Sequence, residues 1–265
     1  PMITTLHGTD ITLVGKHPFY KPAVTFSINQ SDVVTSVSES LKKGTLDIFD
    51  IKGEIVVIPN FIDAKKYSTS FTDCQRSNMA TEEERIVTHI SNFRKVKRIP
   101  DVIKVFSKIL LEIPSKLIMV GEGPEKEGAE RLCEELGIAD KVIFLGNSNE
   151  IDKILCFSDL FLLPSETESF GLAALEAMIN KVPVISSNAG GIPEVNKEGV
   201  SGFLSNVGDI QDMAAKAITI LKDDEVLERF KLNALKEAHK FDIQKVLPLY
   251  EAVYERAFKG RFKNV

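Results

Sequence analysis

The stretch that decides the fold is Ser165-Glu166-Thr167-Glu168-Ser169-Phe170-Gly171-Leu172, followed directly by Ala173-Ala174-Leu175-Glu176-Ala177-Met178. The apolar run that precedes it, residues 159–163, is typical of a buried strand. After the polar turn, Leu172, Leu175 and Met178 recur at helical spacing and predict a helix over residues 171–180. The stretch therefore predicts a strand that leads into a helix through a short polar turn.

Two carboxylates, Glu168 and Glu176, flank this turn at an offset of eight residues, a little over two helical turns. Between them, the backbone N–H groups of Phe170, Gly171 and Leu172 are the donors that the first turn of a helix leaves unpaired. An anion site between two hydroxyl-binding carboxylates suits a phosphorylated sugar. The alternative interpretation is an ordinary helix start, with Glu176 on a solvated face.

Strand and helix patterns alternate along the whole chain, which predicts the α/β class with a parallel sheet. The predicted strands are residues 2–6, 33–36, 55–58, 85–90, 116–120, 141–145, 159–163 and 183–186. The predicted helices are residues 99–111, 125–136, 171–180, 210–222, 225–239 and 246–258. A stretch rich in Asn, Asp, Ser and Thr without periodicity, residues 59–80, reads as a linker.

Composition is that of an ordinary globular chain, with 43% hydrophobic and 27% charged residues. A net charge of −5 gives no general attraction to nucleic acid. No apolar run approaches the length that spans a bilayer, so we expect a cytoplasmic protein without stable membrane insertion. The three cysteines, Cys74, Cys133 and Cys156, are scattered, and we expect reduced thiols and no disulfide. Homo-oligomer formation stays open.

The glutamate pair and several further motifs resemble the retaining, two-domain glycosyltransferases of family 4. The motifs that follow in the order of that family are His7-Gly8-Thr9-Asp10, Pro59-Asn60-Phe61-Ile62-Asp63, Ser91-Asn92-Phe93-Arg94-Lys95-Val96-Lys97-Arg98, Val120-Gly121-Glu122-Gly123-Pro124, Phe144-Leu145-Gly146 and Gly190-Gly191-Ile192-Pro193-Glu194. The resemblance covers nearly the whole chain and implies the GT-B fold, which has two Rossmann-like domains.

The resemblance also implies that the first of these domains is incomplete in this chain. Residues 1–62 then form the C-terminal part of the acceptor domain, and residues 63–82 the linker. Residues 83–243 form the nucleotide-sugar donor domain, and residues 244–265 a helix that returns to the first domain. A chain of this extent is expected to bind the nucleotide weakly and to be inactive alone.

Basic residues follow the strand at 85–90, where ligands of parallel sheets bind. Cations there suit a diphosphate and stabilise the charge that develops as the glycosidic bond breaks. Many relatives have Gly-Arg where this chain has Ser91-Asn92. Lys97 matches the family's Lys, and Arg94 is the candidate for the displaced Arg. A solvated basic loop is the alternative interpretation.

The remaining site residues come from the resemblance. Glu168 holds the sugar hydroxyls and Glu176 the ribose, while Ser169, Phe170, Gly171 and Leu172 border the phosphates. Gly121 and Leu145 lie beside the nucleotide, although the glycines around Gly121 are by themselves weak evidence. His7 contacts the transferred sugar, and Thr9 and Asp10 are candidates for substrate binding. Capping of the next helix is the alternative for Asp10.

Within the family, residues 4–12 and 91–98 most resemble enzymes that transfer N-acetylglucosamine from UDP-N-acetylglucosamine to L-malate, the first step of bacillithiol biosynthesis. The acceptor hydroxyl attacks from the face that the nucleotide leaves, with retention. No Asp-x-Asp pair occurs, so we expect neither metal nor cofactor. Two alternatives stay open: a family member that acts on a cell-surface polysaccharide or lipid intermediate, and an inactive nucleotide-sugar-binding fragment.

Overall fold

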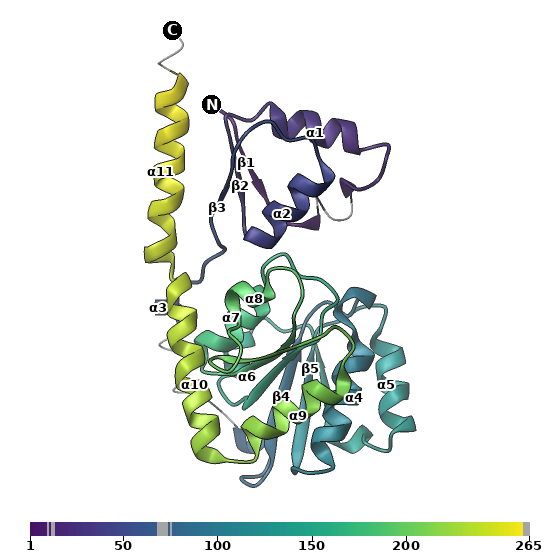
Figure 1. Cartoon of the computed structure of the whole chain (residues 1–265). Helices are drawn as coiled ribbons and strands as arrows, with labels where there is room; N and C mark the ends of the chain where they lie inside the picture. The colour runs from purple at the N-terminus through teal and green to yellow at the C-terminus, as the bar shows by residue number, and fades with distance from the viewer. Residues whose placement is uncertain (10, 12–13, 68–73, 75, 262–265) are drawn as a thin grey trace. The chain divides into compact units, whose positions relative to one another are not determined.

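The structure of the chain is a computed structural model that describes residues 1–9, 11, 14–67, 74 and 76–261. The chain folds into two compact units (Figure 1). Unit 1 consists of Pro1–Asp63, Glu168–Phe170 and Phe241–Val265, and unit 2 of Ala64–Thr167 and Gly171–Lys240. The described residues of the predicted linker after position 63 therefore belong to unit 2.

Unit 1 is built on a parallel three-stranded sheet of order β1-β2-β3. Its strands are β1 (Ile3–Leu6), β2 (Val33–Ser36) and β3 (Ile55–Val57). Parallel neighbours need crossover connections, which α1 (Lys21–Asn29) and α2 (Glu39–Ile48) supply here. Ile3 pairs with Val33, and Val34 with Ile55.

The last helix, α11 (Ile243–Arg261), belongs to unit 1 and packs against its sheet. Val246, Val253 and Ala257 of this helix form a buried apolar cluster with Val33 and Ile58. This apolar face matches the amphipathic pattern of the sequence there, and it buries one side of a helix that is otherwise exposed.

Unit 2 contains a parallel six-stranded sheet of order β6-β5-β4-β7-β8-β9. The strands are β4 (Arg85–Ile90), β5 (Ser115–Val120), β6 (Val142–Gly146), β7 (Leu160–Leu163), β8 (Val184–Ser187) and β9 (Gly202–Ser205). The α-helices are α3 (Ala64–Tyr67), α4 (Ile99–Leu110), α5 (Lys126–Glu135), α6 (Ile151–Leu155), α7 (Leu172–Ile179), α8 (Ile192–Val195), α9 (Ile210–Leu221) and α10 (Asp224–Ala238). The short 3-10 helices are η3 (Arg76–Asn78), η4 (Lys95–Lys97), η5 (Ala139–Lys141) and η6 (His239–Phe241).

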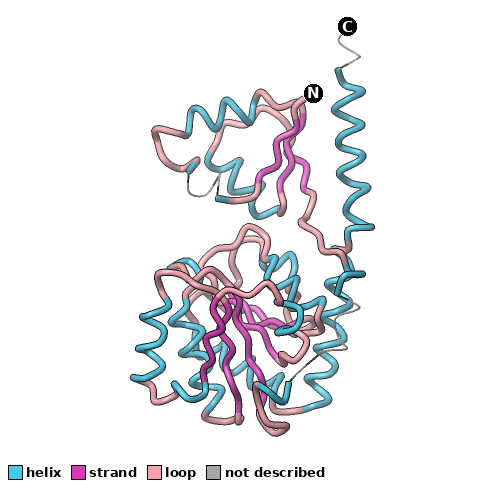
Figure 2. Tube along the Cα trace, turned by 180° about the vertical axis from the view of Figure 1, so that it is seen from behind, coloured by secondary structure: helices cyan, strands magenta, loops and turns pink. Residues whose placement is uncertain are grey.

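Helices cover both faces of this sheet, so its strands are apolar on both sides (Figure 2). All four residues of β7, Leu160–Leu163, are buried. The larger apolar cluster joins one face of the sheet to α4, α5, α9 and α10, and a second cluster joins the other face to α6. Continuous burial explains why β7 reads as an unbroken apolar run and not as an alternating one.

The strand order changes direction between β4 and β7. From β4 the chain builds outward through β5 to β6, and it then returns to β7 on the other side of β4 and continues to β9. In open α/β sheets, ligands bind in the crevice at the carboxyl ends of the strands where the order reverses. The loops after β4 and β7 therefore border the candidate site of unit 2.

Several elements were not predicted from the sequence, namely β9, α1, α2, α3 and α6. Strand β9 has only two apolar residues between Gly202 and Ser205. A side chain at Gly202 would place its Cβ 1.8 Å from the Val184 carbonyl oxygen, so close packing against β8 requires glycine there. Helix α1 buries only Ile28, and its weak amphipathic pattern gives little signal in the sequence.

The cysteines correct one expectation. Cys74 and Cys156, separated by 82 positions, form a disulfide with a Cα–Cα distance of 5.9 Å, whereas the sequence predicted reduced thiols. Spacing cannot reveal such a pair because the fold, not the sequence, brings the two residues together. Cys133 is buried and free, and burial raises the pKa of its thiol to about 11.

The thiol count tests this pairing. Without reductant, the native chain should show no rapidly reacting thiol with Ellman's reagent, because Cys133 is buried and little of it ionises at neutral pH. Denaturation should release one thiol, and added reductant should raise the count to three. Three thiols in the denatured, unreduced chain would contradict the disulfide.

Candidate functional site at the strand-order switch

Two loops meet where the strand order reverses: residues 91–98 after β4 and residues 164–171 after β7. The β4–β7 register consists of Val87 opposite Leu160 and Thr88 opposite Phe161. Beyond that point the Glu166 N–H donates to the Val96 carbonyl oxygen at 2.8 Å and joins the two loops. The loop that carries the predicted cations thus lies against the loop that carries the glutamate motif.

The cations of loop 91–98 differ in their surroundings. Arg94 is exposed and Lys97 is half-buried in the short helix η4. Arg98 adopts a left-handed φ of 53° and its guanidinium Nε donates to the buried carboxylate of Asp101 at 2.5 Å. The Arg98 pair has a structural role at the start of α4. Arg94 and Lys97, the two cations singled out in the sequence, remain the candidates for a phosphate group.

Glycines of the loop after β5 let loop 91–98 pack closely. A Cβ on Gly121, whose φ is +127°, would lie 1.8 Å from the Ser91 carbonyl oxygen, and one on Gly123 would lie 2.5 Å from that of Phe93. The sequence predicted that Gly121 allows close approach to a ligand. In the structure, the close approach at Gly121 is to the neighbouring loop, and contact with a nucleotide stays a prediction.

Helix α7 begins without a side-chain cap. Its N-cap residue is Gly171, which has a φ of 100° and no side chain to cap the helix. Helices α2, α9 and α10 instead begin at Ser38, Asp209 and Asp223, whose side chains accept such hydrogen bonds. The start of α7, from Leu172 onward, therefore offers backbone donors to an anion.

Glu176 lies on α7 among groups from two other helices. It is half-buried, and burial together with Asp152 of α6 raises the pKa of its carboxyl group. Burial raises the pKa of Tyr67, on α3, to about 12, and the charges of Glu176 and Asp152 add to that rise. The sequence singled out Glu176 but not Tyr67 or Asp152, since these contacts join three separate helices. A half-buried carboxylate here is costly to ionise and is stabilised by hydroxyl donors.

Family models match almost the whole chain. Residues 71–237 match the model of glycosyl transferases group 1, and residues 1–66 match that of glycosyltransferase family 4. The chain is a group 1 glycosyltransferase. It is 43% identical over 255 residues to N-acetyl-alpha-D-glucosaminyl L-malate synthase of Bacillus anthracis, which covers 96% of this chain and 67% of that protein.

More distant relatives and solved structures agree with this family. The 2-deoxystreptamine N-acetyl-D-glucosaminyltransferase of Niallia circulans is 26% identical over 274 residues, covering 96% of this chain and 69% of that protein. The Anabaena Alr3699/HepE structure, at 22% identity, covers 96% of this chain and 71% of its own, with a TM-score of 0.84. Sucrose-phosphate synthase of Thermosynechococcus elongatus, at 21% identity, covers 97% and 68% with the same TM-score. The fold is GT-B, as the sequence predicted.

Several other predicted site residues of this glycosyltransferase fall in unit 1. His7 and Thr9 are exposed after β1, while Asp10 lies outside the described residues. Within unit 1 a Cβ on Gly8 would lie 2.6 Å from that of Ser169, and the Ser38 hydroxyl donates to the Ser169 carbonyl oxygen at 2.6 Å. The structure thus brings Ser169 next to the loop that contains His7.

Three further predicted residues are placed by packing. Glu168, beside Ser169, is half-buried, and Phe170 is buried with its ring edge-on to Phe241 at 5.5 Å. Leu145 is partly buried and packs against the apolar cluster of Ile86 and Ile118. Its side chain therefore belongs to the core, and only its backbone groups could bind the base of a nucleotide.

His89 of β4 is a residue that sequence reasoning missed. It is buried at the strand-order switch, with hydrogen bonds to β7 and to Ser91. Burial lowers its pKa to about 4. A lone histidine in an apolar strand does not indicate a function by itself. Its position two residues before loop 91–98 is the signal that could have identified it.

Metal and membrane features are absent from the described part of the chain. No group of three or more His, Cys, Asp or Glu side chains is arranged to hold a metal ion among the residues that the structure describes. No helix within those residues is long and apolar enough to cross a membrane. Whether catalysis is independent of metal stays a prediction.

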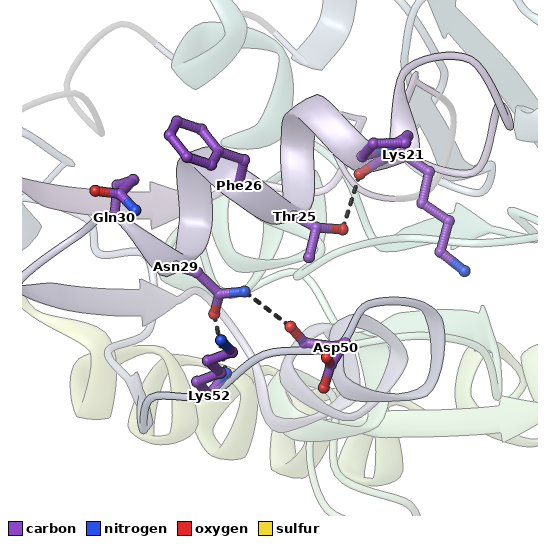
Figure 3. Close-up of a pocket in the computed structure, with 8 residues that line it drawn as sticks. Lys21, Thr25, Phe26, Asn29, Gln30, Asp50 and Lys52 are labelled. Carbon is purple, nitrogen blue, oxygen red and sulfur yellow. Dashed lines mark hydrogen bonds between the residues drawn. The ribbon is translucent and has the colours of Figure 1, made fainter.

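A groove of about 590 Å³ beside α1 in unit 1 is a second concave surface (Figure 3). Asn29 closes its floor, since its side chain donates to the Asp50 carbonyl oxygen at 2.8 Å and accepts from the Lys52 N–H at 2.9 Å. Lys21 and Phe26 also line it. Its inner polar groups are paired with one another, so the groove shows less sign of a built site than the switch between β4 and β7.

Substitution of Gly121 tests the packing of loop 91–98. Gly121→Ala should lower the free energy of unfolding by about 3 kcal/mol or more, because a Cβ there meets the Ser91 backbone and φ is positive. Gly128→Ala, in α5 with no atom within 4 Å of its Cβ, is the matched control and should raise it by about 0.5–1 kcal/mol. Chemical denaturation measures both, and equal effects would refute the packing argument.

Glu176→Gln tests the desolvated carboxylate. Because the pKa of Glu176 is raised in the folded chain, ionisation of this carboxyl group lowers the free energy of unfolding. This loss is absent below the unfolded pKa of 4.5, grows as the pH rises toward the folded pKa, and is complete above it. The variant should therefore melt like the parent near pH 4 and higher than it at pH 7 to 8, by about 2–4 °C for each kcal/mol gained. Glu127→Gln, exposed on α5, is the matched control and should not raise the melting temperature at pH 7 to 8. Equal melting at all pH values would contradict the proposed environment.

Proposed function

We propose that this glycosyltransferase transfers N-acetylglucosamine from UDP-N-acetylglucosamine to L-malate with retention, the first step of bacillithiol biosynthesis. The observation that carries the proposal is the 43% identity to the Bacillus anthracis L-malate synthase over 96% of the chain. The chain spans 67% of that synthase, so the donor site of unit 2 and the acceptor side of unit 1 are argued separately.

The donor diphosphate is held at the strand-order switch. Arg94 and Lys97 of loop 91–98 supply positive charge, and the uncapped start of α7 at Leu172 supplies backbone donors. Charge develops on the diphosphate as the glycosidic bond breaks, so donors that are already oriented stabilise the transition state. No metal or cofactor is needed for this step in the proposal.

Glu176 binds the ribose and Glu168 the transferred sugar. Ribose hydroxyls donate hydrogen bonds to the ionised Glu176 carboxylate and offset its desolvation, so nucleotide binding should lower the raised pKa. The residue is thus unfavourable for folding and favourable for binding. Such a conflict between stability and function is typical of binding sites.

On the acceptor side, His7 orients the transferred sugar, with Thr9 and Asp10 nearby in sequence. The malate hydroxyl forms a bond to the anomeric carbon on the face from which UDP departs. The bond to the diphosphate oxygen breaks, and the departing phosphate takes the hydroxyl proton. A dicarboxylate needs cations, and Lys16 and Lys21 are the ones that the sequence offers in unit 1.

A different acceptor is the second candidate, and one observation favours it. Phe19 is 81% and Tyr20 51% exposed, and both adjoin Lys21 in unit 1. Exposed aromatic rings beside lysine suit a lipid-linked or polysaccharide acceptor. The two candidates share the donor site and differ only in the acceptor.

Product analysis decides between the candidates. Since this chain spans 67% of the matched synthase, product formation is measured on a protein extended to the full length of that synthase. That protein is incubated with UDP-N-acetylglucosamine, with and without L-malate, and the products are read by mass spectrometry, while UDP binding is measured by calorimetry on the chain itself. We expect a malate-dependent glycoside that survives chelation with EDTA. Glu176→Gln should weaken UDP binding about tenfold, since a charged hydrogen-bond acceptor is lost, whereas the exposed control Glu127→Gln should bind as the parent does.

Each failure has its own meaning. UDP binding without a malate product would discard malate as the acceptor and favour the second candidate. Loss of product on chelation would contradict a metal-independent mechanism. Unchanged UDP affinity in Glu176→Gln would remove Glu176 from the ribose-binding role, whatever its effect on stability.

A further inference from the structure

His89 lies directly after the last backbone pair of β4 and β7. The register of these strands includes Thr88 opposite Phe161, the residue just before Leu162. At the next position along β4, the imidazole of His89 makes a hydrogen bond to β7, with Nδ1 at 2.8 Å from the Leu162 carbonyl oxygen. A side chain thus holds the two strands together at the edge of the site.

Both ring nitrogens are used, and their roles follow from their partners. A carbonyl oxygen only accepts, so Nδ1 carries the hydrogen and donates to Leu162. In the neutral ring Nε2 is then unprotonated and accepts from the Ser91 hydroxyl, 2.8 Å away. The neutral ring with its hydrogen on Nδ1 is the form that satisfies both contacts.

The surroundings keep the ring in that form. His89 has no exposed surface and lies between the rings of Phe93 and Phe161, whose centroids are 6.2 and 6.3 Å away. Burial above all lowers its pKa to about 4; the Leu162 hydrogen bond opposes this shift and the positive charge of Lys97 contributes to it. At neutral pH the imidazole therefore stays an acceptor for Ser91.

Ser91 in turn is fixed through three of its groups. Its hydroxyl donates to His89, its N–H donates to the Val120 carbonyl oxygen at 3.1 Å, and its own carbonyl lies under Gly121. Every residue of loop 91–98 that follows is oriented from this first position. Of these three contacts, only the hydrogen bond to His89 uses the side chain of Ser91; the other two use its backbone.

We infer that His89 is a positioning residue of the donor site: its imidazole ties β7 to the Ser91 hydroxyl and thereby fixes the loop that carries Arg94 and Lys97. This inference rests on the proposed function, in which those cations bind the diphosphate. His89 itself touches neither substrate nor reacting atom. It acts through Ser91, the first residue of that loop.

Paired substitutions separate the two hydrogen bonds. His89→Asn keeps a donor for Leu162 but removes the acceptor for Ser91, and Ser91→Ala removes the donor from the other side. Each should weaken UDP binding, measured by calorimetry, by about tenfold, because a small displacement of binding groups is costly. The double variant should be no weaker than either single one, since both remove the same contact. His89→Gln, whose amide oxygen reaches the place of Nε2, should recover part of the affinity.

Thr88→Val is the matched control on the same strand. The buried Thr88 hydroxyl pairs with that of Ser158 at 2.6 Å, so its loss should lower the melting temperature without changing UDP affinity. A ¹⁵N NMR spectrum of the imidazole should show hydrogen on Nδ1 in the parent, with the Nε2 signal shifted in Ser91→Ala.

Three results would overturn the inference: unchanged UDP affinity in His89→Asn, additive losses in the double variant, or an equal loss in Thr88→Val. If the parent chain itself fails to bind UDP, the proposed function fails, and the positioning role falls with it. Binding by the parent combined with any of those three results refutes the positioning role alone. The two failures are therefore distinguishable.

Discussion

The parting of β4 and β7 is the constraint on which the donor half of this glycosyltransferase depends. Two parallel strands that are neighbours in a sheet have to separate where the strand order reverses, since their chains continue toward opposite sides. The backbone ladder between the two strands consists of Val87 opposite Leu160 and Thr88 opposite Phe161 and ends there. Two hydrogen bonds join the strands and their loops beyond that point. The Glu166 N–H donates to the Val96 carbonyl oxygen, and the His89 imidazole donates to the Leu162 carbonyl oxygen.

The loops after β4 and β5 pack closely against one another at two glycines. Gly121 and Gly123 remove the Cβ atoms that would collide with the backbone of Ser91 and Phe93. Binding groups that are held in place before the ligand arrives lose little entropy on binding. The glycine-rich turn after β5 is thus a support for the neighbouring cationic loop, in addition to any contact with the nucleotide.

The site also concentrates unfavourable features. Helix α7 begins without a side-chain cap, and Glu176 is desolvated beside Asp152 and Tyr67. Helices α2, α9 and α10 begin with Ser or Asp caps, whereas α1, α4, α5, α6 and α8 also begin without one, so the missing cap alone does not mark a site. Open donors and a costly carboxylate at one place are what a nucleotide sugar complements, with phosphates for the donors and hydroxyls for the carboxylate.

Sequence by itself determined the α/β class, most strands of both sheets, the glutamate pair and the basic loop. These signals are local: apolar runs of strand length, helical spacing, and charged residues directly after a strand. Tertiary structure decided the rest. It paired Cys74 with Cys156 and placed Tyr67 and Asp152 beside Glu176. It also brought the imidazole of His89, on β4, to the Leu162 carbonyl oxygen of β7, a strand far away in the sequence. These contacts join segments that only the folded sheet and its helices bring together, and no spacing along the chain encodes such a distance.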